Sequence, residues 1–344
     1  CQYFYCSMSV KFQKSLFFSL SGLLLLFFGF RLEAQPTAEK ILARQQQIAC
    51  LNLIYKTKFD SAKRLIASFP KQEEAYKSLF QLFSLRWEHI PIATSKEKDN
   101  YLNKLLSFSE AISSRKDVTQ QLYFHTTTEL LLAEYFYNNG ETFKALLHGK
   151  RAYPFMVQAL DASGSDPELL FVKGMYLYYM DFFRSKGFVY RTALFPFRDG
   201  DQKKGLTLLE KSASESSLAF TEANIYMAHI YLHLENEPLK ALPYSQKLVK
   251  MYPENAKFSE LLIDNLISCG RYDEASVYLD EQLKQTYAYF KIPALYFAAQ
   301  VEALRKKNSS KAKELLTECI ALSSKTKLCQ DVAQKAEAYL SEIK

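Results

Sequence analysis

Apolar residues recur along the chain at helical spacing, in pairs of segments separated by short polar turns. The clearest stretch runs from Ala223 to Lys284, where an apolar helix, a polar turn, a second helix opening near Ala241 and a loop containing Pro253 follow one another. The same order then repeats through Gly270 and Ala275. Tandem helical hairpins are typical of a solenoid in which stacked units bury one continuous apolar core. The sequence therefore predicts an all-α solenoid.

Small residues in this pattern mark the points where two helices are expected to touch. Ala241 and Ala275 begin second helices, where a larger side chain would push the paired helices apart. Gly270 is expected to end its helix in a backbone conformation that a residue with a Cβ atom resists. The spacing in the second pass resembles the tetratricopeptide repeat family at Leu262, Leu266, Gly270, Tyr272, Ala275 and Leu279. The resemblance implies a right-handed superhelix of about eight hairpins, each near 34 residues.

The other expected elements follow from periodicity and from weaker forms of the same signature. A second match lies between Thr126 and Tyr153, with Gly140 and Ala145 at the expected intervals. The remaining elements are a degenerate hairpin over Thr37 to Phe69, helices over Lys71 to His89 and Lys96 to Ser113 separated at Pro91, a helix opening at Asp166 and Pro167 with Gly174 as its small residue, a hairpin over Ile292 to Lys307 and Ser310 to Leu322, and a last helix over Leu328 to Ile343.

The repeat is interrupted by an insertion over Phe182 to Arg198. Six aromatic residues alternate there with four cations, and the second helix resumes only at Asp201, with Gly205 as its small residue. This composition suits an acidic or aromatic partner or an anionic head group. The alternative is that the aromatic rings fill the core while the cations stay solvated. The candidate contacts in the insertion are Phe188, Tyr190 and Arg191.

The N-terminal stretch has the order of a secretory signal. After Met8 come a basic start, an apolar run from Leu16 to Phe30 and a small residue at Ala34. A membrane span needs about 20 apolar residues, so cleavage after Ala34 is favoured over an uncleaved anchor. Gln35 as the first mature residue resembles exported proteins of Bacteroidota-like Gram-negative bacteria. We expect residues 1–34 to be upstream sequence and signal, and residues 35–344 to form one repeat domain in the periplasm or associated with the outer membrane.

Composition and motif content narrow the function classes. Hydrophobic residues make up 48% of the chain, and the formal net charge is +7. Lysines alternate with glutamates along most helices, which indicates solvated faces rather than a nucleic-acid surface. Nucleophile elbows, phosphate-binding loops and dinucleotide fingerprints are missing, so we expect neither an enzyme nor a cofactor. Cys319 and Cys329 are spaced so that a disulfide is possible, whereas Cys50 and Cys269 are expected to pack as small apolar residues.

Ionisable residues on two successive first helices give the second candidate site. His229 and His233 lie one turn apart, but Ile230 replaces the glutamate of a zinc protease motif and a third ligand is missing, so no metal is predicted. In the tetratricopeptide family such first helices line a concave groove. The resemblance places on that groove Glu222, His229, His233, Lys257, Glu260 and Asp264. Glu260 and Asp264 would repel a C-terminal carboxylate, so a basic or mixed peptide is favoured.

Three functions compete on this evidence. The first is a non-enzymatic scaffold of the cell envelope that binds a peptide or helix of a partner protein in the groove. The second is a binder of a lipid or other amphipathic small molecule at the aromatic insertion. The third, a metal-dependent hydrolase, depends on His229 and His233 alone.

Overall fold

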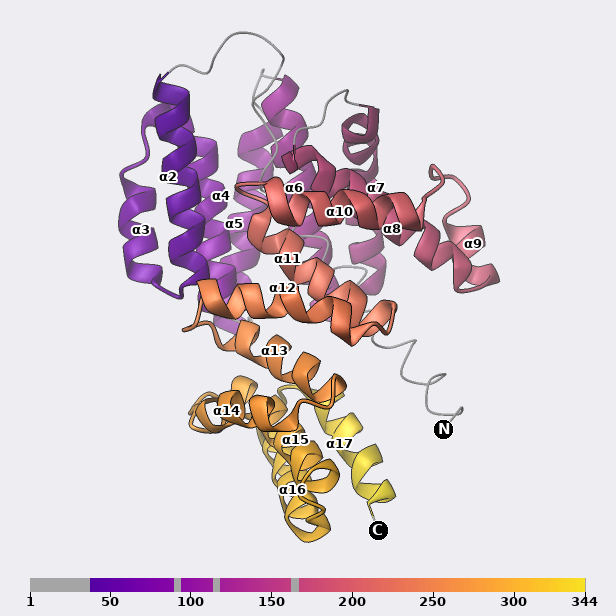
Figure 1. The fold of residues 1–344 in the computed structure, drawn as a ribbon. Helices are drawn as coiled ribbons and strands as arrows, with labels where there is room; N and C mark the ends of the chain where they lie inside the picture. Colours follow the sequence, from indigo (N-terminus) through magenta and orange to yellow (C-terminus); the bar gives the residue numbers. More distant parts are fainter. Residues whose placement is uncertain (1–37, 90–93, 114–117, 162–166, 344) are drawn as a thin grey trace. The chain divides into compact units, whose positions relative to one another are not determined.

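The regular structure of this chain is helical throughout the part that the structure covers. The computed structural model describes residues 38–89, 94–113, 118–161 and 167–343, and no strand occurs within them (Figure 1). Among these residues no helix has both the length and the apolar character needed to cross a membrane. The predicted signal segment, the break at Pro91 and the cap at Asp166 lie outside the described residues. The prediction of an all-α fold is confirmed.

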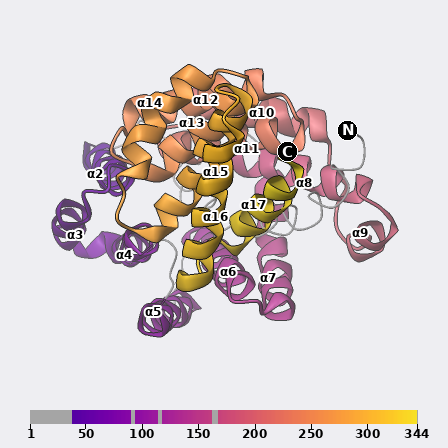
Figure 2. The same ribbon diagram turned by 90° about the horizontal axis from the view of Figure 1, so that it is seen from below.

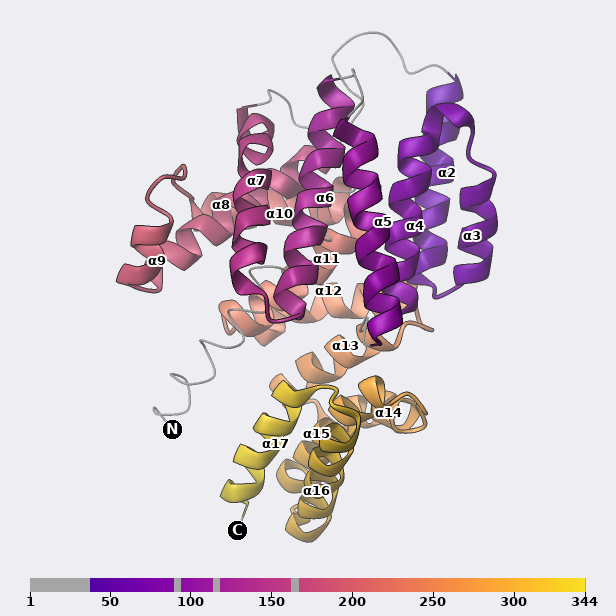
Figure 3. The ribbon, with the colours of Figure 1, turned by 180° about the vertical axis from the view of Figure 1, so that it is seen from behind.

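The helices form two compact units, of which the first ends at Ala223 and the second begins at Asn224. In the first unit the helices from α2 to α9 each pack on the next in the chain, α10 packs on α8, and α2, α4, α5 and α6 stand side by side in Figure 3. The elements are α2 (Ala38–Tyr55), α3 (Phe59–Ala67), a 3-10 turn η2 (Lys71–Glu73), α4 (Glu74–Glu88), α5 (Ser95–Ser113), α6 (Val118–Asn138), α7 (Thr142–Asp161), α8 (Pro167–Ser185), α9 (Phe188–Ala193) and α10 (Gln202–Glu215).

Two glycines allow α8 and α10 to cross closely. A Cβ atom on Gly174 would lie 2.9 Å from the carbonyl oxygen of Gly205, and one on Gly205 would lie 2.5 Å from the backbone nitrogen of Tyr178. Both distances are too short for a real side chain, so each helix needs glycine where the other passes. The structure therefore confirms both predicted small positions, and α8 and α10 form one hairpin that the insertion interrupts.

The second unit consists of paired helices in which alternate members touch. α13 packs on α15 and α15 on α17, while α15, α16 and α17 lie side by side (Figure 2). We call the π-helical turn η3 together with α13, α15 and α17 the first-helix row. The elements are α11 (Phe220–His229), which contains the boundary between the units, η3 (Ile230–Leu234), α12 (Pro238–Met251), α13 (Ala256–Ser268), α14 (Tyr272–Leu283), α15 (Ala288–Leu304), α16 (Ser309–Thr326) and α17 (Gln330–Glu342).

The turn that joins the two helices of a hairpin recurs with the same geometry. Gly270 has a φ of 71°, and the next amide, that of Arg271, donates to the carbonyl of Leu266 at 2.8 Å. Gly140 has a φ of 80° in the corresponding turn between α6 and α7. The predicted small residues lie at the helix crossings with no exposed surface, namely Ala145, Ala241 and Ala275. These predictions are confirmed.

Several predicted boundaries are wrong, and prolines explain two of them. α7 continues through Pro154 to Asp161, and α15 begins at Ala288 rather than at Ile292 and contains Pro293. The predicted helix boundaries lie next to these two prolines because proline usually ends a helix. Pro293 lacks the amide that would bond to the carbonyl four residues earlier, so the carbonyl of Tyr289 is left to accept from the Cys329 thiol at 3.5 Å.

The cysteines that the structure describes are free thiols. Cys319 is buried and its thiol donates to the carbonyl of Ile292 at 3.4 Å, so it and Cys329 each contact the backbone of α15 instead of one another. The possible disulfide between these two residues is therefore not formed. Cys50 has no exposed surface, as expected of a packing residue.

Candidate functional site

Five of the predicted contact residues come together in the second unit, on η3, α11 and α13. We call them the α13 polar cluster: His229, His233, Lys257, Glu260 and Asp264. On α13 the last three are spaced so that they share one face of the helix. The opposite side of this helix carries Leu262 and Leu266, each 1% exposed, which hold it in the core. The local amphipathic pattern thus fixes which way the polar residues point.

The two histidines lie where the helix changes its hydrogen bonding. From Ile230 to Leu234 the turn is π-helical, and the amide of Glu235 donates to the carbonyl of Ile230 at 2.9 Å. The ring centroids of His229 and His233 are 5.4 Å apart. Wide turns of this kind are frequent at functional sites. Periodicity did not reveal the π turn, since its extra residue changes the spacing only locally.

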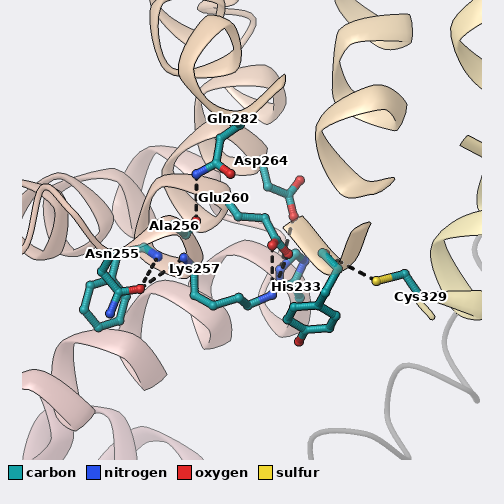
Figure 4. A network of polar contacts seen from close by, with 10 residues as sticks. His233, Asn255, Ala256, Lys257, Glu260, Asp264, Gln282 and Cys329 are labelled. Carbon is teal, nitrogen blue, oxygen red and sulfur yellow. Dashed lines mark hydrogen bonds and ion pairs between the residues drawn. The ribbon is translucent and has the colours of Figure 1, made fainter. Parts of the chain in front are cut away.

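His233 contacts the carboxylate of Asp264 across the gap between η3 and α13. Its Nε2 atom lies 3.5 Å from Oδ2 of Asp264, as Figure 4 shows. Burial, and then the charge of Lys335 on α17, lower the pKa of His233 to about 4. Burial raises the pKa of Asp264 to about 6, against the opposing effect of Lys335. At neutral pH the imidazole is therefore uncharged and Asp264 is a carboxylate with Lys335 as its nearby cation.

Lys257 and Glu260 form the other half of the cluster. The ammonium Nζ of Lys257 donates to both carboxylate oxygens of Glu260, at 2.8 and 2.9 Å, and lies 4.9 Å from the centre of the Tyr289 ring on α15. Burial opposes the charged form of Lys257, but Glu260 and Tyr289 outweigh it, so the pKa of the lysine is raised. The contact with Tyr289 extends the cluster from α13 onto α15.

Several contacts hold α13 in place beneath the cluster. The side chain of Asn255 caps the helix by accepting from the amides of Lys257 at 3.1 Å and Phe258 at 3.4 Å (Figure 4). Gln282 of α14 donates to the carbonyl of Ala256 at 2.9 Å. The bonds to Asn255 satisfy amides at the start of the helix, where intrahelical partners are missing, and the bond from Gln282 ties this turn to α14. The first turn of α13 is therefore a fixed platform for Lys257.

His229 completes the cluster with an unusual feature. Its Nδ1 atom is buried and has no hydrogen-bond partner among the described residues. Burial, then the charges of His233 and Lys257, lower its pKa to about 3. A buried polar atom without a partner costs free energy, so such an atom points to a missing ligand or partner group. No group of three or more histidine, cysteine, aspartate or glutamate side chains that could hold a metal ion occurs in the described ranges.

Glu222, the remaining predicted groove residue, belongs to a different network. It lies in the first unit, is only 4% exposed, and accepts a hydrogen bond from the Tyr55 hydroxyl at 2.6 Å. The guanidinium of Arg86 binds Glu134 through two nitrogens, the shortest contact being 2.7 Å. The charge of Arg86 thus acts on two carboxylates, on Glu134 by direct contact and on Glu222 through its electrostatic effect. Burial raises the pKa of Glu222 to about 7, against the opposing effects of Arg86 and of the hydrogen bond from Tyr55.

This network could not be predicted from local sequence patterns, because its members are far apart in the chain. Tyr55 and Glu222 are 167 residues apart, and Arg86 and Glu134 are 48 apart. Each residue alone is unremarkable in a helix. The one local signal is Glu222 itself, a lone acid in the apolar first turns of the helix that begins at Phe220, and this pattern fits a groove residue equally well.

The aromatic insertion is divided between core and surface. Phe182 and Phe183 belong to the end of α8 and are 4% and 1% exposed, so the predicted start of the insertion at Phe182 is wrong. Of the predicted contacts, Tyr190 packs near Phe183 with ring centroids 5.8 Å apart, whereas Phe188 is 79% exposed and Arg191 is exposed. The core alternative is therefore confirmed for Phe182 and Phe183, while partner contact by Phe188, Tyr190 and Arg191 stays a prediction.

Comparison with known proteins identifies no relative. No protein-family model matches the chain, and no curated protein matches it. The resemblance to tetratricopeptide repeats therefore stays a prediction, supported by the residues and turns described above.

Proposed function

We propose that this protein is a non-enzymatic scaffold of tetratricopeptide type, which binds an extended or helical segment of a partner protein along the first-helix row of its second unit. The observation that carries the proposal is the α13 polar cluster. Its ionisable groups lie on successive first helices and contact one another from η3 to α13 and from α13 to α15.

The repeat geometry supports the assignment to this type of solenoid. Asn236, Gly270 and Lys307 have positive φ values of 56°, 71° and 56°, and each lies in the turn between the two helices of a hairpin. The first two are one tetratricopeptide period apart, about 34 residues. In the proposed arrangement these hairpins belong to a right-handed superhelix of about eight units.

The charge balance of the cluster favours a partner segment of mixed polarity. Glu260 is already paired with Lys257, while Asp264 has only neutral His233 and the nearby charge of Lys335 to offset it. The unpartnered Nδ1 of His229 accepts or donates one hydrogen bond according to its tautomer. A segment that places a cation at Asp264 would offset the charge of this carboxylate.

The test is site-specific photo-crosslinking in the cells that produce the protein. A photoreactive amino acid replaces Glu260, whose side chain is 22% exposed on the first-helix row, or Glu281, which is 75% exposed on α14. The proposal predicts a discrete adduct with one protein from position 260 and none from position 281. Adding Asp264→Asn should reduce the adduct at position 260. Equal labelling from both positions, or none from position 260, would refute the proposal.

A binder of small amphipathic molecules finds less support at the insertion. Phe182 and Phe183 pack into the core, and the exposed Phe188 and Phe195 protrude rather than enclose a site. The exposed part of the insertion suggests a different ligand.

A further inference from the structure

The protruding part of the insertion consists of α9 and the turn that follows it. α9 projects from the end of the α8–α10 hairpin in Figures 1 and 3. Phe188 is the first residue of α9 and Phe195 lies in the turn after it. They are 79% and 84% exposed, which makes them the most exposed large apolar side chains in the described residues. Apolar surface that is gathered in one place can mark an interaction site, and these two rings belong to one short segment.

Hydrogen bonds hold this segment outward instead of letting it fold onto the core. The Arg184 guanidinium donates to the carbonyls of Leu194 and Phe197, at 2.8 and 2.6 Å, and contacts the Asp199 carboxylate. Arg198 is fixed as well, because its amide donates to the Tyr153 hydroxyl at 3.0 Å. The exposure of the two phenylalanines is therefore a property of the fold and not of a loose loop.

The charges around the two rings are positive. Lys186 and Arg191 are exposed on either side of Phe188. Each of the two nearby acids has a partner: Asp199 contacts Arg184, although its side chain is 92% exposed, and Asp181 accepts a hydrogen bond from the amide of Gln202 at 3.0 Å. An incoming surface therefore meets two phenyl rings flanked by cations.

The apolar area of the two phenylalanines favours a lipid surface over a protein as the binding partner of α9. A stable protein interface buries about 800 Å² on each partner. Two phenylalanines supply roughly 150–250 Å² each, from a helix of six residues, and present no flat face. Single apolar side chains flanked by cations are instead suited to the boundary between head groups and acyl chains of an anionic bilayer.

We propose that α9 docks the protein on an anionic lipid surface. Phe188 and Phe195 insert between the head groups, and Lys186 and Arg191 lie against the phosphates. This contact uses the first unit only and is independent of the partner segment proposed for the second.

The experiment measures the depth of single positions on vesicles. The full chain carries Phe188→Trp, Phe195→Trp or, as a control, Leu239→Trp on α12, where the native leucine is 73% exposed. Fluorescence is recorded with vesicles of phosphatidylglycerol and dibrominated phosphatidylcholine. The native Trp87 and the apolar segment Leu16 to Phe30 are common to all three variants, so they cannot produce a difference between them.

We expect the tryptophans at 188 and 195 to be quenched at least twice as strongly as the one at 239. Replacing both Lys186 and Arg191 by glutamine should weaken vesicle binding of the Phe188→Trp protein, by roughly fivefold for each cation. Vesicle binding of the Phe188→Trp protein should also be weaker when the vesicles carry no net charge. The proposal is wrong if the tryptophan at position 188 is quenched no more than the one at position 239. It is also wrong if the quenching is the same on anionic and neutral vesicles. Unchanged helical circular dichroism of each variant shows that folding is not the cause.

Discussion

Replacing Glu222 with glutamine is expected to stabilise the protein at pH 8 and to leave its stability unchanged at pH 4.5. Glu222 is 4% exposed, and the nearby guanidinium of Arg86 is bound through two nitrogens to another carboxylate, that of Glu134. Glutamine keeps an oxygen that accepts the hydrogen bond from Tyr55. It removes only the charge, which the buried site disfavours.

The size of the effect follows from the pKa. Glu222 has a pKa of about 7 in the folded protein against 4.5 ordinarily. One pKa unit corresponds to about 1.4 kcal/mol, so the ionised form costs the folded state about 3 kcal/mol. Because the folded pKa is the higher of the two, this cost is absent below pH 4.5, grows between pH 4.5 and about 7, and is constant above that range.

The assay is urea unfolding of both proteins across this pH range, with the difference in free energy of unfolding plotted against pH. The contributions of other groups, including the histidines, are common to both proteins and cancel in the difference. Glu134→Gln is the matched control, and it should destabilise at pH 8 because it removes the ion pair of Arg86. A Glu222→Gln protein that is less stable than the wild type at pH 8, or a difference that does not change with pH, would refute this reasoning.

Three further predictions concern packing and the same network, and denaturant unfolding measures each. Gly205→Ala should destabilise by about 1–3 kcal/mol, because its Cβ would lie 2.5 Å from a backbone nitrogen of α8. A Cβ atom on Gly149 would meet nothing within 4 Å, so Gly149→Ala should be neutral or stabilising. Equal changes in the free energy of unfolding for Gly149→Ala and Gly205→Ala would contradict the close crossing of α8 and α10. Gly270→Ala should cost about 1 kcal/mol from its φ of 71°, and no loss would argue against the left-handed turn. Arg86→Met should lower the free energy of unfolding by about 3–5 kcal/mol, and adding Glu134→Leu should restore most of it. If the two substitutions lower the free energy of unfolding additively, Arg86 and Glu134 do not act as a buried pair.

The features that could be predicted from the sequence are those that act locally. Ala241, Ala275 and Gly270 were identified because a helix crossing or a helix end demands a small residue at one position. Gly174 and Gly205 were also found, although the insertion separates them in the chain. In each case the physical requirement falls on a single residue, so a single position reveals it.

Features that depend on distant residues could not be predicted. The ion pair of Arg86 with Glu134 joins helices far apart in the chain, and no local pattern connects Tyr55 with Glu222. The boundary of α15 was misplaced because Pro293 lies inside the helix, where tertiary packing outweighs the loss of one backbone hydrogen bond. For the α13 polar cluster, helical spacing predicted the shared face but not the π turn or the contacts of Lys257 with Tyr289.

Hydrogen exchange tests the central proposal most directly, because it reports which row of helices a partner covers. Amide exchange is compared for the protein alone and with the partner identified by crosslinking. The proposal predicts slower exchange in α13 and α15 on partner binding, with α14 and α16 unchanged. Protection confined to α14 and α16, or equal exchange in both states, would contradict it.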